Sequence, residues 1–83
     1  MIIEILPKTK KQMAKLSKMV GLSVIAKIRD LSTDQPNLQI KKMQKHKDMY
    51  RVRVGNYRIV YHQLTNLIQI VAVQHRKDVY REL

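Results

Sequence analysis

The sequence predicts an α+β domain in which an N-terminal strand and a two-helix hairpin precede a three-stranded antiparallel meander, with the helices packed on one face of the sheet. Apolar residues recur at helical spacing in the first half and alternate with polar residues in the second half, where Gly-Asn separates two alternating runs. A chain of 83 residues has room for one modest core, so residues 1–83 are expected to form a single domain.

The first strand is expected at the N-terminus. A short apolar run stops at Pro7, a residue that suits the start of a helix, and the run consists of Ile2, Ile3, Ile5 and Leu6. We therefore expect a buried strand that leads directly into a helix.

A helical hairpin is expected next. Residues 8–20 carry many lysines and an apolar stripe of Met13, Leu16, Met19 and Val20. Gly21 is expected to end this basic helix, and Ser23 to cap a second one. The apolar stripe of that second helix consists of Val24, Ile25, Ile28 and Leu31. Residues 32–39 have the composition of a loop, and residues 40–47 are expected to be a loop with a short extended piece.

The second half contains a strong hairpin signal. Gly55-Asn56 lies between two alternating runs, and glycine in first place is what a type II′ turn requires. With these two residues in the turn, Arg53 opposes Arg58. The alternation assigns six residues to the core side of the hairpin: Tyr50, Val52, Val54, Tyr57, Ile59 and Tyr61. The other side holds Arg51, Arg53 and Arg58 with Val60.

The chain then forms its last expected strand. Residues 67–73 are apolar on both faces, which is typical of an interior strand. The polar segment that follows, residues 74–81, is expected to lie beside the hairpin.

Charge restricts the possible partners. Seventeen Lys and Arg residues against six Asp and Glu residues give a net charge of +11. Nucleic acid, an anionic membrane surface or an acidic protein would relieve this self-repulsion. Arginine has a planar fork that suits phosphate oxygens and stacks on bases, so an arginine cluster on one face of a hairpin favours nucleic acid.

The composition argues against several other classes of function. The chain has no cysteine, and its histidines lack carboxylate neighbours, so we expect no metal site and no cofactor. His46 and His62 are expected to be structural. No apolar run reaches the ~20 residues that cross a bilayer, and the N-terminus lacks the pattern of a signal peptide, so a cytoplasmic protein without a membrane partner is expected.

Two segments together resemble the signatures of RelE-type toxins. They are residues 50–61, YRVRVGNYRIVY, and residues 75–81, HRKDVYR. The resemblance covers nearly the whole chain and implies the RelE-like fold. It also implies a toxin of a type II toxin-antitoxin system that cuts messenger RNA on the ribosome, with the RNA 2′-hydroxyl as nucleophile and without metal.

The resemblance also implies roles for individual residues. Arg51 and Arg53 occupy positions at which RelE itself has lysines, and Arg58 corresponds to an arginine that stabilises the phosphate. Arg76 corresponds to the proposed general acid, and Tyr80 to a tyrosine that orients or stacks the substrate. Because guanidinium is not deprotonated in proteins, the base must be another group. The candidates are His75, Lys45 and Lys47. The basic stretch Lys41, Lys42, Lys45 and Lys47 is expected to bind RNA.

Two alternative functions remain open. The same scaffold serves ParE-like proteins that inhibit DNA gyrase, and the absent lysines also permit a catalytically degenerate RNA-binding member of the family. The partners implied by the resemblance are a cognate antitoxin, the ribosome and mRNA, with operator DNA contacted only through the antitoxin complex.

Overall fold

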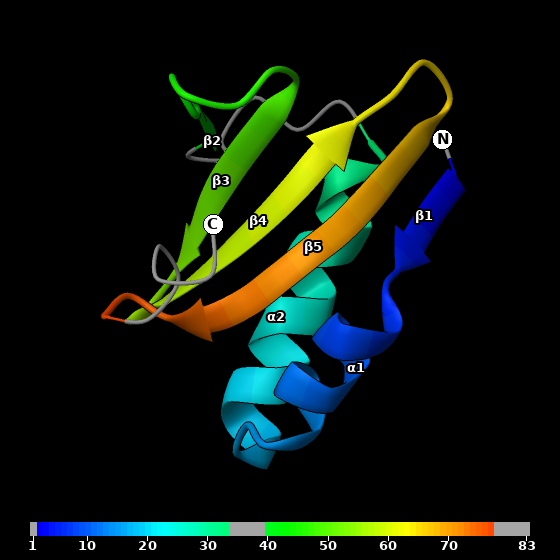
Figure 1. Cartoon of the computed structure of the whole chain (residues 1–83). Helices are drawn as coiled ribbons and strands as arrows, with labels where there is room; N and C mark the ends of the chain where they lie inside the picture. Colours follow the sequence, from blue (N-terminus) through cyan, green and yellow to red (C-terminus); the bar gives the residue numbers. More distant parts are fainter. Residues whose placement is uncertain (1, 34–39, 78–83) are drawn as a thin grey trace.

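The computed structural model describes residues 2–33 and 40–77, which form two helices and a five-stranded sheet (Figure 1). The elements are β1 (Ile2–Ile5), α1 (Pro7–Ala14), α2 (Lys18–Leu31), β2 (Ile40–Lys42), β3 (Met49–Val54), β4 (Tyr57–Gln63) and β5 (Leu67–His75). Across the sheet the strands lie in the order β1-β5-β4-β3-β2. The predicted α+β class and the meander of β3, β4 and β5 are confirmed.

β5 is the interior strand that its apolar sequence predicts. It pairs antiparallel with β4 and parallel with β1, where Ile3 lies beside Ile68 and Ile5 beside Ile70. β1 itself is at the edge of the described sheet, and Ile2 is 68% exposed. The expectation of a buried first strand is therefore wrong, because only the Ile3 and Ile5 face of β1 packs against the core.

The helix boundaries differ from the prediction. α1 ends at Ala14, and α2 begins after Ser17, whose hydroxyl accepts a hydrogen bond from the Val20 amide at 3.3 Å. Ser17 is thus the cap that we assigned to Ser23. Gly21 lies inside α2, where its amide donates to the Ser17 carbonyl at 2.8 Å, so it does not end a helix. A glycine inside a helix costs only about 1 kcal/mol relative to alanine.

The early end of α1 changes which residues face the sheet. The turn at residues 15–17 resets the helical phase, so Met19 no longer continues the stripe of Met13 and Leu16. Met13 and Leu16 pack on the core, whereas Met19 is 81% exposed. The prediction that Met19 belongs to the apolar stripe is therefore wrong.

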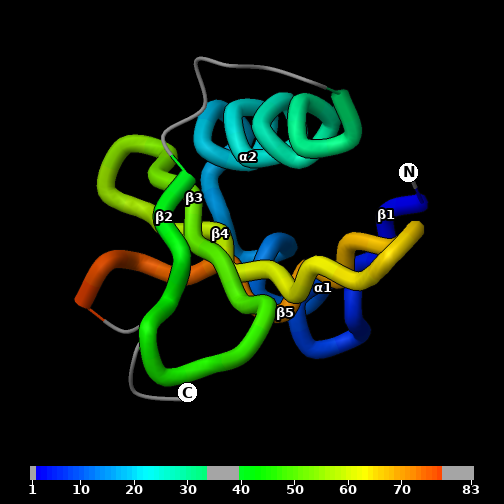
Figure 2. Tube along the Cα trace, turned by 90° about the horizontal axis from the view of Figure 1, so that it is seen from above, coloured from blue at the N-terminus to red at the C-terminus, as the bar shows by residue number. Residues whose placement is uncertain are grey.

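The main core lies between the helices and one face of the sheet, which we call the helix face. α2 runs along this face (Figures 1 and 2). The buried residues that form the core are Val24, Ile28, Leu31, Val52, Ile59, Tyr61, Ile68, Ile70 and Val73. α1 is anchored by Thr9, which is fully buried and donates its hydroxyl to the carbonyls of Ile70 at 2.9 Å and Val71 at 2.7 Å.

The β3–β4 hairpin has the predicted register. Val54 pairs with Tyr57, Arg53 with Arg58, and so on to Tyr50 with Tyr61. Gly55 has a φ of +59°, as the first turn residue of a type II′ turn requires, and Asn56 has no positive φ. The short extended piece expected within residues 40–47 is β2, which pairs with β3.

The opposite side of the sheet, which we call the open face, carries a smaller apolar cluster. Met43, Val60 and Ala72 are buried there, with Met49 packed against them. The residues around this cluster are mostly polar or charged. Among residues 2–33 and 40–77, no helix is long and apolar enough to span a membrane.

Candidate nucleic-acid interface

The arginines of the hairpin lie on the open face of the sheet. Arg51 pairs with Val60 and Arg53 with Arg58, and Val60 belongs to the open-face cluster. Residues that oppose one another share a face, so Arg51, Arg53 and Arg58 share the open face as the sequence predicts. The helices occupy the other side of the sheet (Figure 1).

These arginines affect one another electrostatically. The pKa of Arg58 is lowered first by partial burial and then by the charges of Arg53, Arg51 and Arg76. Each of those causes disfavours the charged form, and a bound anion would act in the opposite sense. No acidic residue occurs within residues 49–63 to offset the repulsion. We call these four residues, Arg51, Arg53, Arg58 and Arg76, the arginine cluster.

Backbone contacts hold parts of the arginine cluster in place. Arg58 Nη1 donates to the Tyr57 carbonyl at 3.2 Å, and Arg53 Nε donates to the Gly55 carbonyl at 3.3 Å. The Arg76 amide donates to the Asn56 carbonyl at 2.8 Å, which ties the segment after β5 to the hairpin turn. The prediction that this segment lies beside the hairpin is therefore confirmed for residues 74–76.

The predicted RNA-binding lysines do not form one group. Lys41 pairs with Arg51 and so extends the arginine cluster onto β2, whereas Lys42 pairs with Tyr50 and lies on the opposite side of the strand. Lys45 and Lys47 are exposed in the connection between β2 and β3. Lys41 is therefore the lysine of this set that the pairing places beside the arginines.

His75 lies on the opposite side of the sheet from Arg51, Arg53 and Arg58. It pairs with Tyr57, a residue on the helix side of the hairpin, and the two rings meet edge to face with centroids 5.5 Å apart. Its Nδ1 accepts a hydrogen bond from the Lys77 amide at 3.3 Å. This placement argues against His75 as the proton-transfer group, although its role remains a prediction. Tyr80 lies outside the described residues.

Two further residues lie on the open face: Gln74, which the sequence did not single out, and His62, which was expected to be structural. Gln74 pairs with Arg58, and its buried Oε1 has no hydrogen-bond partner among residues 2–33 and 40–77. His62 pairs with Met49 on one side and with Gln69 on the other. The pairing of Gln74 could not be read from alternation, because a register shift between Val60 and Tyr61 leaves Val71 unpaired with β4.

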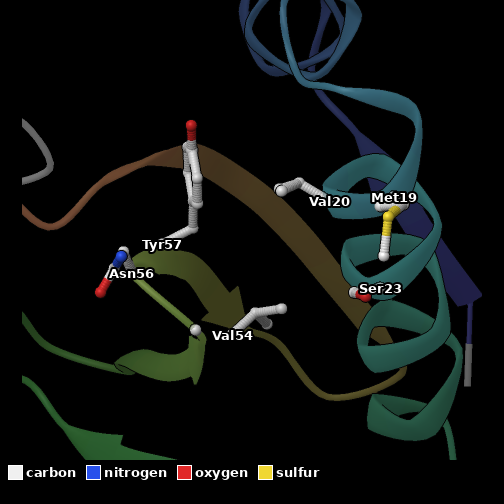
Figure 3. Close-up of a pocket in the computed structure, with 7 residues that line it drawn as sticks. Met19, Val20, Ser23, Val54, Asn56 and Tyr57 are labelled. Carbon is white, nitrogen blue, oxygen red and sulfur yellow. The ribbon is translucent and has the colours of Figure 1, made fainter.

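A separate hollow lies on the helix side of the molecule, between the start of α2 and the hairpin turn (Figure 3). Its volume is about 280 Å³, and it is lined by Met19, Val20, Ser23, Val54, Gly55, Asn56 and Tyr57. None of these side chains carries a positive charge. The hollow therefore suits an apolar side chain of a protein partner better than it suits a phosphate.

The arginine cluster is suited to binding a phosphodiester chain. Guanidinium groups supply several N–H donors in a fixed fork, and such charge-assisted hydrogen bonds to phosphate are about twice as strong as neutral ones. Within residues 2–33 and 40–77, no three His, Asp or Glu side chains gather to hold a metal ion. Among the described residues, positive charge is thus the main chemical property of this face.

Comparisons with known proteins agree with this fold. The model of the ParE toxin of type II toxin-antitoxin systems matches residues 3–80. A chain of the RelB-RelE antitoxin-toxin complex from Methanococcus jannaschii superposes with a TM-score of 0.79 and 24% identity, covering 96% of this chain and 98% of that one. A search of curated protein sequences gave no significant match.

Two further structures share the fold at lower identity. The isolated E. coli RelE toxin superposes with a TM-score of 0.75 and 18% identity, covering 99% of this chain and 98% of that one. A chain of the YoeB-YefM complex from Staphylococcus aureus gives 0.73 and 15%, covering 88% and 93%.

The fold and the match over nearly the whole chain define a small toxin of the RelE/ParE superfamily. Within that superfamily, the chain belongs to the ParE toxin family of type II toxin-antitoxin systems.

Proposed function

We propose that this toxin is a ribosome-dependent endoribonuclease that cuts messenger RNA. The observation that supports the proposal best is the group of arginines on the open face, where Arg53 pairs with Arg58 and Arg51 shares their side of the hairpin. Like charges this close disfavour one another, so the arrangement fits a surface that is complete only when a polyanion is bound.

The proposed reaction uses the RNA's own nucleophile. The 2′-oxygen attacks the adjacent phosphorus, the bond to the 5′-oxygen breaks, and the products carry a 2′,3′-cyclic phosphate and a 5′-hydroxyl. Arg51, Arg53 and Arg58 position the phosphate and stabilise the negative charge of the transition state. We assign the same charge stabilisation to Arg76, since a guanidinium is a poor proton donor.

Two further contacts belong to the proposal. Lys41 extends the cationic face along β2, and Tyr80 stacks on a base of the substrate, a contact worth roughly 1–3 kcal/mol. Since the substrate is mRNA on the ribosome, the toxin acts in the cytoplasm.

The proposed protein partner is a cognate antitoxin. Solved structures with this fold include the RelB-RelE and YoeB-YefM complexes. On this chain, the cationic open face suits an acidic segment, and the hollow beside Met19 suits an apolar side chain of the same partner. Operator DNA is contacted through the antitoxin in this proposal.

The test is to map transcript 5′ ends after brief induction of the toxin. We expect new ends in phase with the reading frame, and these ends should carry a 5′-hydroxyl, which follows from attack by the 2′-oxygen. An inhibitor of translation initiation added before induction should abolish the cuts, because it removes ribosomes from the transcripts. Cuts that persist on ribosome-free transcripts would contradict the ribosome dependence.

The second candidate function is inhibition of DNA gyrase without cleavage. The match to the ParE toxin model favours it, and so do arginines in place of lysines at positions 51 and 53. The same experiment separates the two functions, because a gyrase inhibitor would produce DNA damage and no ribosome-phased ends. A toxin that gave neither result would fit the degenerate RNA-binding protein.

A further inference from the structure

A second polar row crosses the open face beside the arginine cluster. His62 on β4 pairs with Gln69 on β5, and Gln69 pairs with Glu4 on β1. Ile3 and Ile5, the neighbours of Glu4, pack on the core of the helix face, so Glu4 must lie on the open face. Because opposed residues share a face, His62 and Gln69 lie on it too. His62 is thus on the arginine side of the sheet, whereas His75 pairs with Tyr57 on the other side.

The row is partly fixed by a hydrogen bond. Gln69 Nε2 donates to Glu4 Oε1 at 2.8 Å. Because this bond directs the amide nitrogen towards β1, the carbonyl oxygen of Gln69 is available on the side of β4, where His62 is the cross-strand neighbour. A carbonyl in that position can accept one imidazole N–H and leave the other ring nitrogen free to accept a proton.

His62 is also close to the arginine cluster. Arg51 pairs with Val60, two residues before His62, so Arg51 and His62 are diagonal neighbours with Cα atoms about 7–8 Å apart. Both side chains are only partly buried, which leaves them within reach of a substrate. At this separation, the guanidinium of Arg51 and the imidazole of His62 can contact the same phosphodiester from two sides.

The surroundings of His62 are mixed in charge. Arg51 is its diagonal neighbour on β3, Arg58 lies further along β4, and Lys41 pairs with Arg51 from β2. Glu4 on β1 is the only acidic residue that the pairing places in this row, among the described residues. Met49, directly opposite His62, supplies an apolar wall.

We propose that His62, oriented by Gln69 and Glu4, is the catalytic residue that takes the proton in RNA cleavage; this inference rests on the proposed function. The imidazole accepts the proton of the 2′-hydroxyl as the 2′-oxygen bonds to phosphorus. The bond from phosphorus to the 5′-oxygen breaks, and the leaving oxygen takes a proton from water. The imidazolium then returns its proton to the solvent.

The test is single-turnover cleavage on ribosomes programmed with a defined mRNA, measured over a range of pH. General-base assistance is worth about 10²–10⁴ in rate, so His62→Gln should slow cleavage by that factor and flatten the rise of the rate with pH. His46→Gln is the matched control and should keep the wild-type profile, whereas His75→Gln tests the rival base. Added imidazole should restore part of the rate of His62→Ala, a rescue that a structural role would not give.

Gln69 and Glu4 are positioning residues in this proposal, so their test is spectroscopic. The nitrogen chemical shifts of the His62 ring report which nitrogen carries the proton. We expect one tautomer in the wild-type toxin and a mixture in Gln69→Leu, which fills a similar volume without an amide.

Several outcomes would overturn the inference. Cleavage by His62→Gln at the wild-type rate would do so, as would a loss confined to His75→Gln. If His62→Gln no longer binds ribosomes, the imidazole rescue of His62→Ala becomes the test. Failure of that rescue would also contradict the catalytic role of His62. Absence of cleavage by the wild-type toxin would overturn the proposed function itself. Normal cleavage by the wild-type toxin together with normal cleavage by His62→Gln would overturn only the role of His62.

Discussion

At the scale of single residues, Arg58 is the centre of the arginine cluster. It faces Arg53 across the hairpin, and like charges in that position are unfavourable by about 0.2–1 kcal/mol. We expect Arg58→Gln to abolish growth inhibition while the thermal stability stays unchanged or rises slightly. The glutamine keeps much of the side-chain stem and removes the charge. Thermal unfolding and growth after induction measure the two effects.

The control for this prediction is Arg29→Gln on α2. Arg29 is exposed on α2, and the helices lie on the side of the sheet opposite the open face (Figure 1), so its replacement should leave toxicity intact. A clearly destabilised Arg58→Gln protein would contradict the claim that the charge serves binding and not folding.

Tyr61 gives a prediction about pH at the same scale. Burial, with a smaller effect of the neighbouring Tyr50, raises the pKa of Tyr61 to about 12. The unfolded chain has a tyrosine pKa of about 10, so it releases the proton first as the pH rises. The contribution of Tyr61 to stability is therefore complete below about pH 10 and is lost between about pH 10 and 12, by roughly 2 kcal/mol.

The measurement compares urea unfolding of the wild-type protein with Tyr61→Phe across this alkaline range. The difference between the two proteins isolates Tyr61, because every other group is common to both. We expect the phenylalanine variant to gain relative stability as the pH rises. Parallel curves for the two proteins would show that the Tyr61 hydroxyl is not desolvated in solution.

The site could be predicted from sequence only where a local pattern determines the geometry. Alternation and the Gly55 turn were enough to bring Arg51, Arg53 and Arg58 together, because register in a two-residue hairpin follows from the turn. Gln74 was missed because its pairing with Arg58 depends on a bulge at Val71. His62 was expected to be structural, although the hairpin register already places it opposite Met49 on the side of Val60. Bulges leave no reliable local signal in a single sequence.

At the scale of elements, the start of α2 depends on which serine caps the helix. The Ser17 hydroxyl accepts the Val20 amide, so Ser17→Ala should destabilise the protein by about 1 kcal/mol. Ser23→Ala is the matched control, since Ser23 is exposed within α2 and alanine is the better helix former. Chemical unfolding of both variants distinguishes the observed cap from the one predicted by sequence. Loss of stability in Ser23→Ala alone would favour the predicted boundary.

The elements themselves were predicted better than their ends. Both helices exist, and the error concerned Gly21, which sequence rules treat as a stop signal. Its helical conformation is favoured by the packing of Val20 and Val24 on the sheet, a tertiary effect that propensity does not contain. The edge position of β1 was missed for a related reason, because an apolar run does not say how many strands will flank it.

At the scale of the whole molecule, the distribution of the +11 charge matters more than its size. The arginine cluster lies on the open face, while α1 carries exposed lysines as well. A protein that bound RNA by net charge alone would use both groups equally. Salt dependence can separate the two possibilities, because each neutralised phosphate releases counterions.

The prediction concerns binding of a single-stranded RNA oligomer by the purified toxin over a series of salt concentrations. Each phosphate contact contributes about −0.7 to the slope of log K against log salt. Replacing Arg51, Arg53 and Arg58 together with glutamine should therefore make the slope less negative by about 2. The charge-matched control replaces three exposed lysines of the α1 region, Lys10, Lys11 and Lys15, with glutamine and should change the slope little. Equal changes in the two variants would mean that net charge, and not the arginine cluster, controls binding.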